Sequence, residues 1–252
     1  MKTAFITGAS SGIGMACARK FAANGYRLIL NARREAPLKA LAEELQKNYN
    51  TPTLLLVFDV RDREEAQKRI ASLPAEWQDI DVLINNAGLA LGLEKEYEGD
   101  FADWDTMIDT NIKALLSITR FVVPGMVSRG KGHIINIGSV AGDAAYPNGA
   151  VYCATKAAVK TLSDGLRMDL AHTPLRVTNI KPGLVETNFS VVRFHGDQQR
   201  ADNVYKGIKP LTGEDIAETA YFAASAPAHV QIAEVLVLAT HQASGTVVYR
   251  EQ

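Results

Sequence analysis

The sequence predicts an α/β protein with one doubly wound parallel sheet of seven strands, covered by helices on both faces. Short apolar runs alternate with longer amphipathic stretches along the whole chain, and that alternation favours right-handed βαβ units. Several of the runs are almost continuous in Val, Ile and Leu, which is typical of strands buried on both faces. The first run leads directly into a glycine-rich turn and a helix, the arrangement expected at the start of such a sheet.

The expected elements follow one another without a linker or a repeat, so we expect residues 1–252 to form a single domain. The expected strands are Thr3–Thr7, Arg27–Asn31, Thr53–Phe58, Val82–Asn85, His133–Ile137, Arg176–Ile180 and Glu234–Leu238. The expected helices are Ile13–Asn24, Ala36–Asn48, Arg63–Ser72, Asp103–Val127, Ala150–Ala171 and Glu214–Ala224. The stretch 182–212 fits neither pattern and is expected to be an irregular substrate loop or lid.

Composition excludes several classes of protein. The chain has 252 residues, of which 47% are hydrophobic and 22% charged, so it can bury a full core without disulfides or metals. Its net charge of −1, without a dense basic block, argues against a nucleic-acid partner. No membrane span or signal peptide is evident, so we expect a cytoplasmic protein. Cys17 and Cys153 are then expected to be free thiols, and the scattered histidines predict no metal site.

A glycine-rich turn follows the first strand. Glycines let the backbone turn sharply and approach a pyrophosphate closely, while the helix N-terminus offers free N–H groups and the positive end of its dipole. The spacing is GxxxGxG rather than GxGxxG, and glycines also serve plain turns. The strand before the turn and the helix after it indicate a dinucleotide site. Its expected residues are Gly8, Ser10, Ser11, Gly12, Ile13 and Gly14.

The end of the second strand distinguishes NADP from NAD. An acidic residue there would bind the adenosine ribose hydroxyls and repel a 2′-phosphate. This chain instead has Arg33 and Arg34, and the first acid is Glu35. Arginine suits bidentate phosphate binding, and the helix dipole disfavours cations at a helix start unless something compensates them. The arginines therefore predict NADP(H), although they could also be solvated surface residues.

Two further segments follow predicted strands. Asp59 and Val60 come after the third strand, and Asn86, Ala87 and Gly88 come after the fourth. The carboxyl ends of strands are where open α/β sheets bind ligands. Each segment could equally be a helix cap or a tight turn.

A tyrosine and a lysine four residues apart predict proton-transfer chemistry. Tyr152 and Lys156 share one helical face, and Ser139 follows the fifth strand. An unperturbed tyrosine pKa near ~10 is too high for proton transfer at neutral pH, and a nearby ammonium would lower it. Such a tyrosine can donate a proton to a carbonyl or accept one from an alcohol, with Ser139 holding the substrate oxygen. In an isolated helix the same pair could be a half-buried tyrosine beside a solvated lysine.

Six motifs, spread over essentially the whole chain, resemble those of the short-chain dehydrogenase/reductase family in their order and spacing. They are TGASSGIG, NNAG, DTNIKA, IINIGS, YCATK and KPG. The resemblance implies a Rossmann fold and a catalytic tetrad of Asn111, Ser139, Tyr152 and Lys156. It also implies that Lys156 binds the nicotinamide ribose, that Asn111 holds a water in a proton relay, and that Asp59 and Val60 lie by the adenine. The cofactor would further be lined by Asn86, Ala87, Gly88, Pro182, Gly183, Val185 and Thr187.

Other segments resemble the NADP-dependent 3-hydroxy acid dehydrogenase branch of that family, which includes serine and allo-threonine dehydrogenases. These segments are NNAGLALG, DWDTMIDTN, VVPGMVSRG and NFSVVRFHGD. The resemblance implies a homotetramer that interconverts a small 3-hydroxy acid, such as serine, allo-threonine or 3-hydroxypropionate, and its 3-oxo acid. Reduction of another small carbonyl, such as a sulfonated aldehyde, is the alternative. A nucleotide-sensing regulatory module is disfavoured because Ser139, Tyr152 and Lys156 are all present.

One arginine in the irregular stretch offers an anchor for an acidic substrate. A carboxylate in a partly closed site needs a cation or several donors, because an unpaired buried charge is costly. Arg193 lies between apolar neighbours that could exclude water and strengthen a bidentate pair. The alternative is that Arg193 ties the loop to the protein or meets a neighbouring subunit.

Overall fold

Seven parallel strands form one sheet in the computed structural model, which describes residues 1–251. The order is β3-β2-β1-β4-β5-β6-β7, so the predicted doubly wound Rossmann sheet is confirmed. All predicted strands are present, with small differences at their ends. The strands are β1 (Lys2–Ile6), β2 (Tyr26–Ala32), β3 (Thr53–Val57), β4 (Val82–Asn85), β5 (His133–Ile137), β6 (Arg176–Pro182) and β7 (Glu234–Val237).

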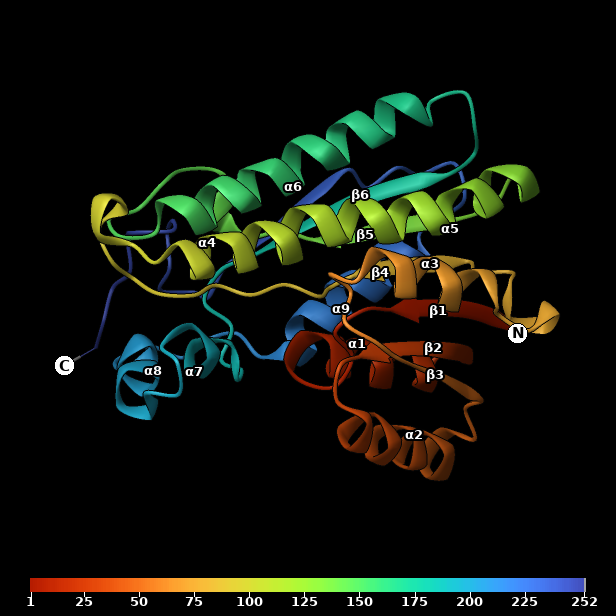
Figure 1. Cartoon of the computed structure of the whole chain (residues 1–252), viewed down its shortest axis with the longest axis horizontal. Coiled ribbons are helices and arrows are strands. Elements are labelled where there is room, and N and C mark those ends of the chain that lie inside the picture. Colours follow the sequence, from red (N-terminus) through yellow and green to blue (C-terminus); the bar gives the residue numbers. More distant parts are fainter. Residues whose placement is uncertain (252) are drawn as a thin grey trace.

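Helices cover both faces of the sheet (Figure 1). One face carries a core that includes Phe21, Leu38 and Ile216, and the other a core that includes Ile118 and Leu170. The first face is covered by α1 (Gly12–Ala23), α2 (Glu35–Tyr49) and α9 (Gly213–Ser225). The second is covered by α3 (Arg63–Ala71), α5 (Leu115–Arg129) and α6 (Ala150–Asp169). Short 3₁₀ turns are η1 (Ala75–Trp77), η2 (Glu96–Glu98) and η4 (Val140–Gly142).

The strand order reverses between β1 and β4. The chain builds β1, β2 and β3 toward one edge of the sheet and then starts β4 on the other side of β1. The segments after β1 and β4 therefore diverge, and this switch point is where open α/β sheets bind ligands. The helices α7 (Phe189–Arg193) and α8 (Gln198–Tyr205) lie near this end of the sheet, at the left of Figure 1.

The predicted single helix Asp103–Val127 is wrong in its bounds and in its regularity. The structure has α4 (Phe101–Ile108), then a π-helical turn, η3 (Asp109–Ala114), and then α5. Asp100 caps α4, because its carboxylate accepts a hydrogen bond from the Ala102 N–H at 2.6 Å. A π turn adds one residue to a helical turn and is often found at functional sites. The apolar periodicity of the sequence does not reveal it, because the helices on both sides of the turn still pack their apolar faces.

The prediction of one irregular stretch over 182–212 is also wrong, because α7 and α8 lie within it. Asp197 caps α8 by accepting a hydrogen bond from the Arg200 N–H at 3.0 Å. Gly196 and Gly207 adopt positive φ angles of +94° and +74° beside these short helices. Helices this short have too few residues to show an apolar period, so the sequence pattern missed them.

Three observations on residues 1–251 bear on the class of protein. No helix within residues 1–251 combines the length and the apolar character that crossing a membrane requires. Within the same residues, no three His, Cys, Asp or Glu side chains are grouped to share a metal ion. Cys17 and Cys153 are buried free thiols.

His133, at the start of β5, is a buried titratable group. Its Nε2 lies 2.7 Å from the Thr178 Oγ1, and burial lowers its pKa from 6.5 to about 3. The folded protein therefore keeps this ring neutral where the unfolded chain would take up a proton. Above pH 6.5 the ring is neutral in both states and does not lower the free energy of unfolding. As the pH falls from 6.5 toward 3, protonation of the unfolded chain lowers that free energy progressively.

We predict that His133→Asn weakens the acid sensitivity of folding. Between pH 7 and pH 5, the free energy of unfolding should fall by about 2 kcal/mol more in wild type than in the variant. The reason is that only in wild type does the unfolded chain take up a proton on this residue that the folded protein does not. Urea unfolding at the two pH values measures the difference. The exposed His172→Asn should behave like wild type. Equal pH dependence in wild type and His133→Asn would contradict the prediction.

Candidate active site

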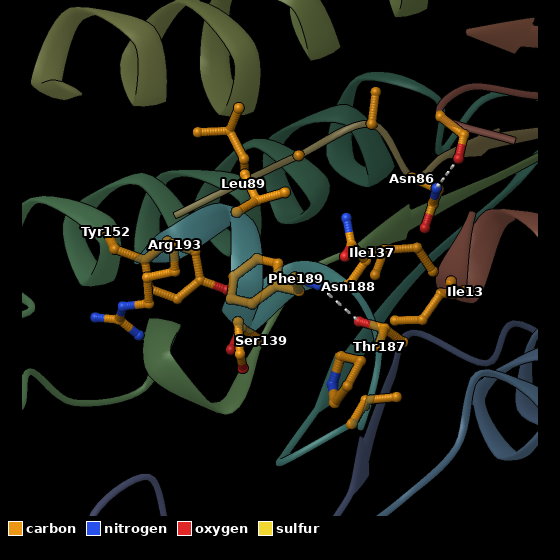
Figure 2. A pocket seen from close by; sticks show the side chains of 18 of the residues that line it. Ile13, Asn86, Leu89, Ile137, Ser139, Tyr152, Thr187, Asn188, Phe189 and Arg193 are labelled. Atoms are coloured by element: carbon orange, nitrogen blue, oxygen red, sulfur yellow. Dashed lines mark hydrogen bonds between the residues drawn. The ribbon is translucent and has the colours of Figure 1, made fainter. Parts of the chain in front are cut away.

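A cavity of about 750 Å³ lies at the carboxyl end of the sheet. In Figure 2, Tyr152 and Arg193 lie toward one side of it, and Ile13 and Asn86 toward the other. Of the residues predicted from sequence, those that line it are Gly8, Ser10, Ser11, Gly12, Ile13, Arg33, Arg34, Asp59, Val60, Asn86, Ala87, Gly88, Ser139, Tyr152, Lys156, Pro182, Gly183, Val185, Thr187 and Arg193. Two predicted residues, Gly14 and Asn111, do not line it.

The glycine-rich turn forms a cradle of backbone at one end of the cavity. Gly8 and Gly12 have φ angles of +65° and +51°, which side chains rarely allow. A Cβ at Gly8 would also lie 2.9 Å from the Asn86 Nδ2. The N-terminus of α1 has no side-chain cap at Ser11 and no acid in its first turn. Its N–H groups and dipole are therefore available to an anion, and the cradle fits the diphosphate of a dinucleotide.

Asn86 and Thr7 join the segments that follow β1 and β4. The Asn86 Nδ2 donates to the carbonyl oxygens of Thr7 at 2.9 Å and Gly8 at 3.1 Å. The Thr7 Oγ1 accepts from the N–H groups of Asn86 and Ala87. These bonds fix the glycine turn across the switch point, so the side chain of Asn86 has a structural part in forming the cavity.

Arginines and one carboxylate gather at the end of the cavity beside β2 and β3. Arg33 and Arg34 are exposed, and neither forms an ion pair within the described chain. Arg61 binds Asp59 through its Nη2, at 2.6 Å from the Asp59 Oδ2. Burial alone would raise the pKa of Asp59, but the bonds from Arg61 outweigh it and lower that pKa. Arg61 also lines the cavity, and sequence reasoning missed it because nothing in its position shows where the side chain reaches.

Tyr152, Ser139 and Lys156 meet at the opposite end. Tyr152 and Lys156 are buried on α6, and Ser139 follows β5. The Lys156 Nζ donates to the Ile137 carbonyl at 2.9 Å and lies 5.9 Å from the centre of the Tyr152 ring. Burial lowers the pKa of Lys156 to about 8.

The expectation that Lys156 lowers the pKa of Tyr152 is wrong for this arrangement. Burial raises the Tyr152 pKa well above its usual value, and Tyr146 raises it further. A hydrogen bond with Ser139 and the charge of Arg193 act in the opposite direction. The physical reason is that a buried phenolate loses its hydration, while the ammonium is directed at a backbone carbonyl.

Asn111 lies in the π turn and joins two segments next to the cavity. Its Nδ2 donates to the Leu89 carbonyl at 2.8 Å and to the Thr155 Oγ1 at 3.0 Å. Its Oδ1 accepts from the Leu89 N–H at 2.9 Å. The side chain therefore ties the segment after β4 to α6, and its part in a proton relay stays a prediction.

Arg193 reaches the tyrosine end of the cavity from α7. Its guanidinium carbon lies 5.6 Å from the centre of the Tyr152 ring, and its Nη1 donates to the Tyr146 hydroxyl at 3.0 Å. Its Nε donates to the Gly92 carbonyl at 3.2 Å, and the Arg193 carbonyl accepts from the Gly92 N–H. Arg193 therefore ties the loop to the protein, as the alternative reading held, and it also faces the cavity. Sequence reasoning missed Tyr146 and Phe189, which complete this wall.

The model of the family described as short chain dehydrogenase matches residues 2–197. The chain belongs to this family. Among its relatives, a protein of Salmonella typhi named NADP-dependent 3-hydroxy acid dehydrogenase YdfG is 50% identical, covering 97% of this chain and 98% of that one. The serine 3-dehydrogenase of Agrobacterium fabrum is 44% identical, covering 99% and 98%. The solved structure titled the closed form of serine dehydrogenase complexed with NADP⁺ is 45% identical, covers 99% and 100%, and has a TM-score of 0.92.

One end of the cavity carries the glycine cradle, and the other carries hydroxyl groups that can exchange a proton with a substrate. The Tyr152 hydroxyl is the proton carrier that the geometry offers, because it is buried against Ser139 and faces the cavity. In the direction of reduction its raised pKa favours the protonated form, the form that donates to a developing alkoxide. In oxidation, Ser139 and Arg193 act against that shift and favour the phenolate.

We predict that Tyr152→Phe lowers kcat by about 10²- to 10⁴-fold, because only the acid–base group is removed. Its affinity for NADPH, measured by quenching of protein fluorescence, should stay close to that of wild type. Tyr221→Phe is the control, since that ring packs on Phe21 away from the cavity. If the turnover of Tyr152→Phe stays within tenfold of wild type, Tyr152 is not the acid–base group.

Proposed function

We propose that this short-chain dehydrogenase is an NADP(H)-dependent oxidoreductase that interconverts a small 3-hydroxy acid and its 3-oxo acid. Serine, allo-threonine and 3-hydroxypropionate are the substrates of the proposed kind. The observation that carries the acid part of the proposal is Arg193, a cation at the tyrosine end of the cavity that has no carboxylate partner within residues 1–251. The names of the relatives at 44% to 50% identity support the same reaction.

The residues present fit NADP(H). The backbone cradle at Gly8 to Gly14 would hold the diphosphate, and Arg33 and Arg34 would hold the 2′-phosphate. Asp59 and Val60 would lie by the adenine, and Lys156 by the nicotinamide ribose. When bound, NADP(H) supplies or accepts the hydride.

The chain's own residues would then orient the substrate and move its proton. Ser139 holds the substrate oxygen and Tyr152 exchanges a proton with it. Lys156, buried with a pKa of about 8, is suited to pass protons near neutral pH, and Asn111 holds the relay in place. Arg193 binds the carboxylate, which places the hydroxyl-bearing carbon beside Tyr152. Phe189 and Val192 cover the cavity from α7, so the loop 182–212 acts as a lid.

The alternative substrate is a small sulfonated aldehyde. A guanidinium binds a sulfonate as it binds a carboxylate, so Arg193 favours either acid over an uncharged carbonyl. The homotetramer remains a proposal from family membership; α5 and α6 leave the apolar side chains of Leu116 and Met168 exposed.

We predict that replacing Arg33 and Arg34 by Ala raises the KM for NADP at least about tenfold and leaves the KM for NAD nearly unchanged. Only NADP carries the 2′-phosphate, and one hydrogen bond to a charged group is worth about 1.5–3 kcal/mol. Initial rates with both coenzymes measure the effect. Arg69→Ala, an exposed arginine paired with Glu65, is the control. A similar increase for both coenzymes would mean that the pair has no phosphate role.

We predict that Arg193→Met raises the KM for serine or 3-hydroxypropionate by at least about tenfold, because the substrate carboxylate loses its cation. The KM for an uncharged alcohol of similar size should change little. Arg200→Met is the matched control, because Arg200 lies on the same lid and stacks on Phe194 instead of lining the cavity. An equal loss with charged and uncharged substrates would make Arg193 structural and would leave the 3-hydroxy acid proposal without its main support.

A further inference from the structure

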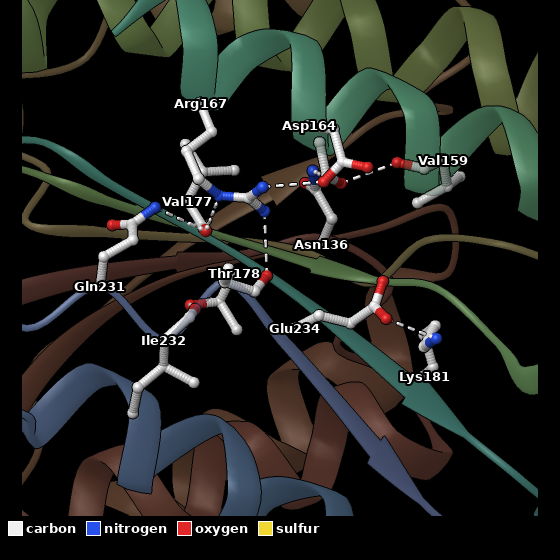
Figure 3. A network of polar contacts seen from close by, with 12 residues as sticks. Asn136, Val159, Asp164, Arg167, Val177, Thr178, Lys181, Gln231, Ile232 and Glu234 are labelled. Atoms are coloured by element: carbon white, nitrogen blue, oxygen red, sulfur yellow. Dashed lines mark hydrogen bonds and ion pairs between the residues drawn. The ribbon is translucent and has the colours of Figure 1, made fainter. Parts of the chain in front are cut away.

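A buried ammonium bridges two carboxylates on the side of β6 that faces α6. The Lys181 side chain is 6% exposed, and its Nζ lies 2.8 Å from the Asp143 Oδ2 and 2.6 Å from the Glu234 Oε1. Figure 3 shows the contact between Lys181 and Glu234. Lys160, on α6, lies 3.8 Å from the same Asp143 carboxylate. None of these four residues lines the cavity.

Asp143 closes the turn that begins at Ser139. The Asp143 N–H donates to the Val140 carbonyl at 3.1 Å, and the Gly142 N–H donates to the Ser139 carbonyl at 3.0 Å. The Ser139 Oγ in turn accepts from the Ala141 N–H at 3.1 Å. The turn is therefore one hydrogen-bonded unit with the serine hydroxyl at its start and the ion-paired carboxylate at its end.

That turn lies directly against α6 at the catalytic lysine. A Cβ at Gly142 would come within 2.6 Å of the Lys156 carbonyl oxygen. On the other side, the Gly138 N–H donates to the Ile180 carbonyl at 2.7 Å, next to Lys181 in β6. A displacement of the turn would therefore change the position of Ser139 relative to Tyr152, because Ser139 begins the turn and Tyr152 lies one helical turn before Lys156 on α6.

Stability alone is a weak reason for such a cluster. A buried ion pair costs about as much desolvation as it returns in attraction, and apolar residues of similar size often stabilise a fold better. What the cluster supplies is geometry. A charge held at three short distances restricts the turn more narrowly than apolar packing would, which is the precision that a proton-transfer site requires.

We propose that Lys181 is a positioning residue for the reaction. By bridging Asp143 and Glu234, it holds the turn from Ser139 to Asp143 against α6 and so sets the distance between the Ser139 hydroxyl and the Tyr152 hydroxyl. The proposal is independent of which small alcohol or carbonyl the enzyme takes.

Lys181→Met tests the proposal in the full-length enzyme with NADP(H). We expect kcat to fall by at least about tenfold, since misplacement near 1 Å can cost about a hundredfold, while the KM for NADP(H) stays within about twofold. The same substitution in a Ser139→Ala background should cause no further loss, because Lys181 acts through that serine. An equal fold-loss in both backgrounds would overturn the proposal.

The pH profile of alcohol oxidation gives a second measure. The hydrogen bond with Ser139 favours the Tyr152 phenolate, so loosening the turn should shift the rise of kcat/KM to higher pH. An unshifted profile would count against the proposal. Asp143→Asn should reproduce the kcat loss and the shift of Lys181→Met, and it keeps the proposal testable if Lys181→Met fails to fold. Glu234→Gln should have the smaller effect, because Glu234 lies on β7 and reaches the turn only through the lysine.

Arg167→Met is the matched structural control. Arg167 also ties α6 to the β6 region, through the carbonyls of Val177 and Ala233, but at a separate part of the network in Figure 3. It should lower the melting temperature while kcat and the pH profile of the folded enzyme stay at wild-type values. If Lys181→Met behaves in the same way, losing stability alone, Lys181 is structural and the proposal is wrong.

Discussion

All seven strands of the sheet run in the same direction, and this direction fixes where the candidate site can form. Parallel strands end at one common edge, so every segment that leaves a strand there begins close to the others. The turn after β1, the Asn86 segment after β4, Ser139 after β5 and Pro182 at the end of β6 all reach the same cavity. Tyr152 and Lys156 lie on one helix, α6, whereas Ser139 and Asn86 follow different strands, and the sheet brings these residues to one cavity.

Below this edge, buried amides connect the sheet to α6. The Asn85 Nδ2 donates to the Asn136 Oδ1 at 2.9 Å, and the Asn136 Nδ2 donates to the Ser163 Oγ at 2.9 Å. This chain of bonds runs from β4 through β5 to the helix that carries Tyr152 and Lys156. Hydrogen bonds between buried side chains restrict how β4, β5 and α6 can pack against one another. Helix α6 is therefore held by the turn of Ser139 at the end that carries Tyr152 and Lys156, and by these amides farther along its length.

Burial acts on the two titratable groups of the site in the same sense. It disfavours the charged form of each, raising the pKa of Tyr152 and lowering that of Lys156. The groups that lower the pKa of Tyr152, and so favour its phenolate, are Ser139 and Arg193. Because Arg193 lies on α7, the position of α7 bears on the pKa of Tyr152.

The strands, most helices, the glycine turn and the tyrosine–lysine pair could be predicted from the sequence, because each depends on local periodicity or on residues within one turn. The π turn at Asn111, the helices α7 and α8, the Arg61–Asp59 pair and the direction of the Lys156 ammonium could not, because they depend on tertiary packing. A long side chain can reach several partners, and which one it contacts depends on how distant segments pack. Burial and distance are properties of the folded chain, whereas periodicity can be read from the sequence.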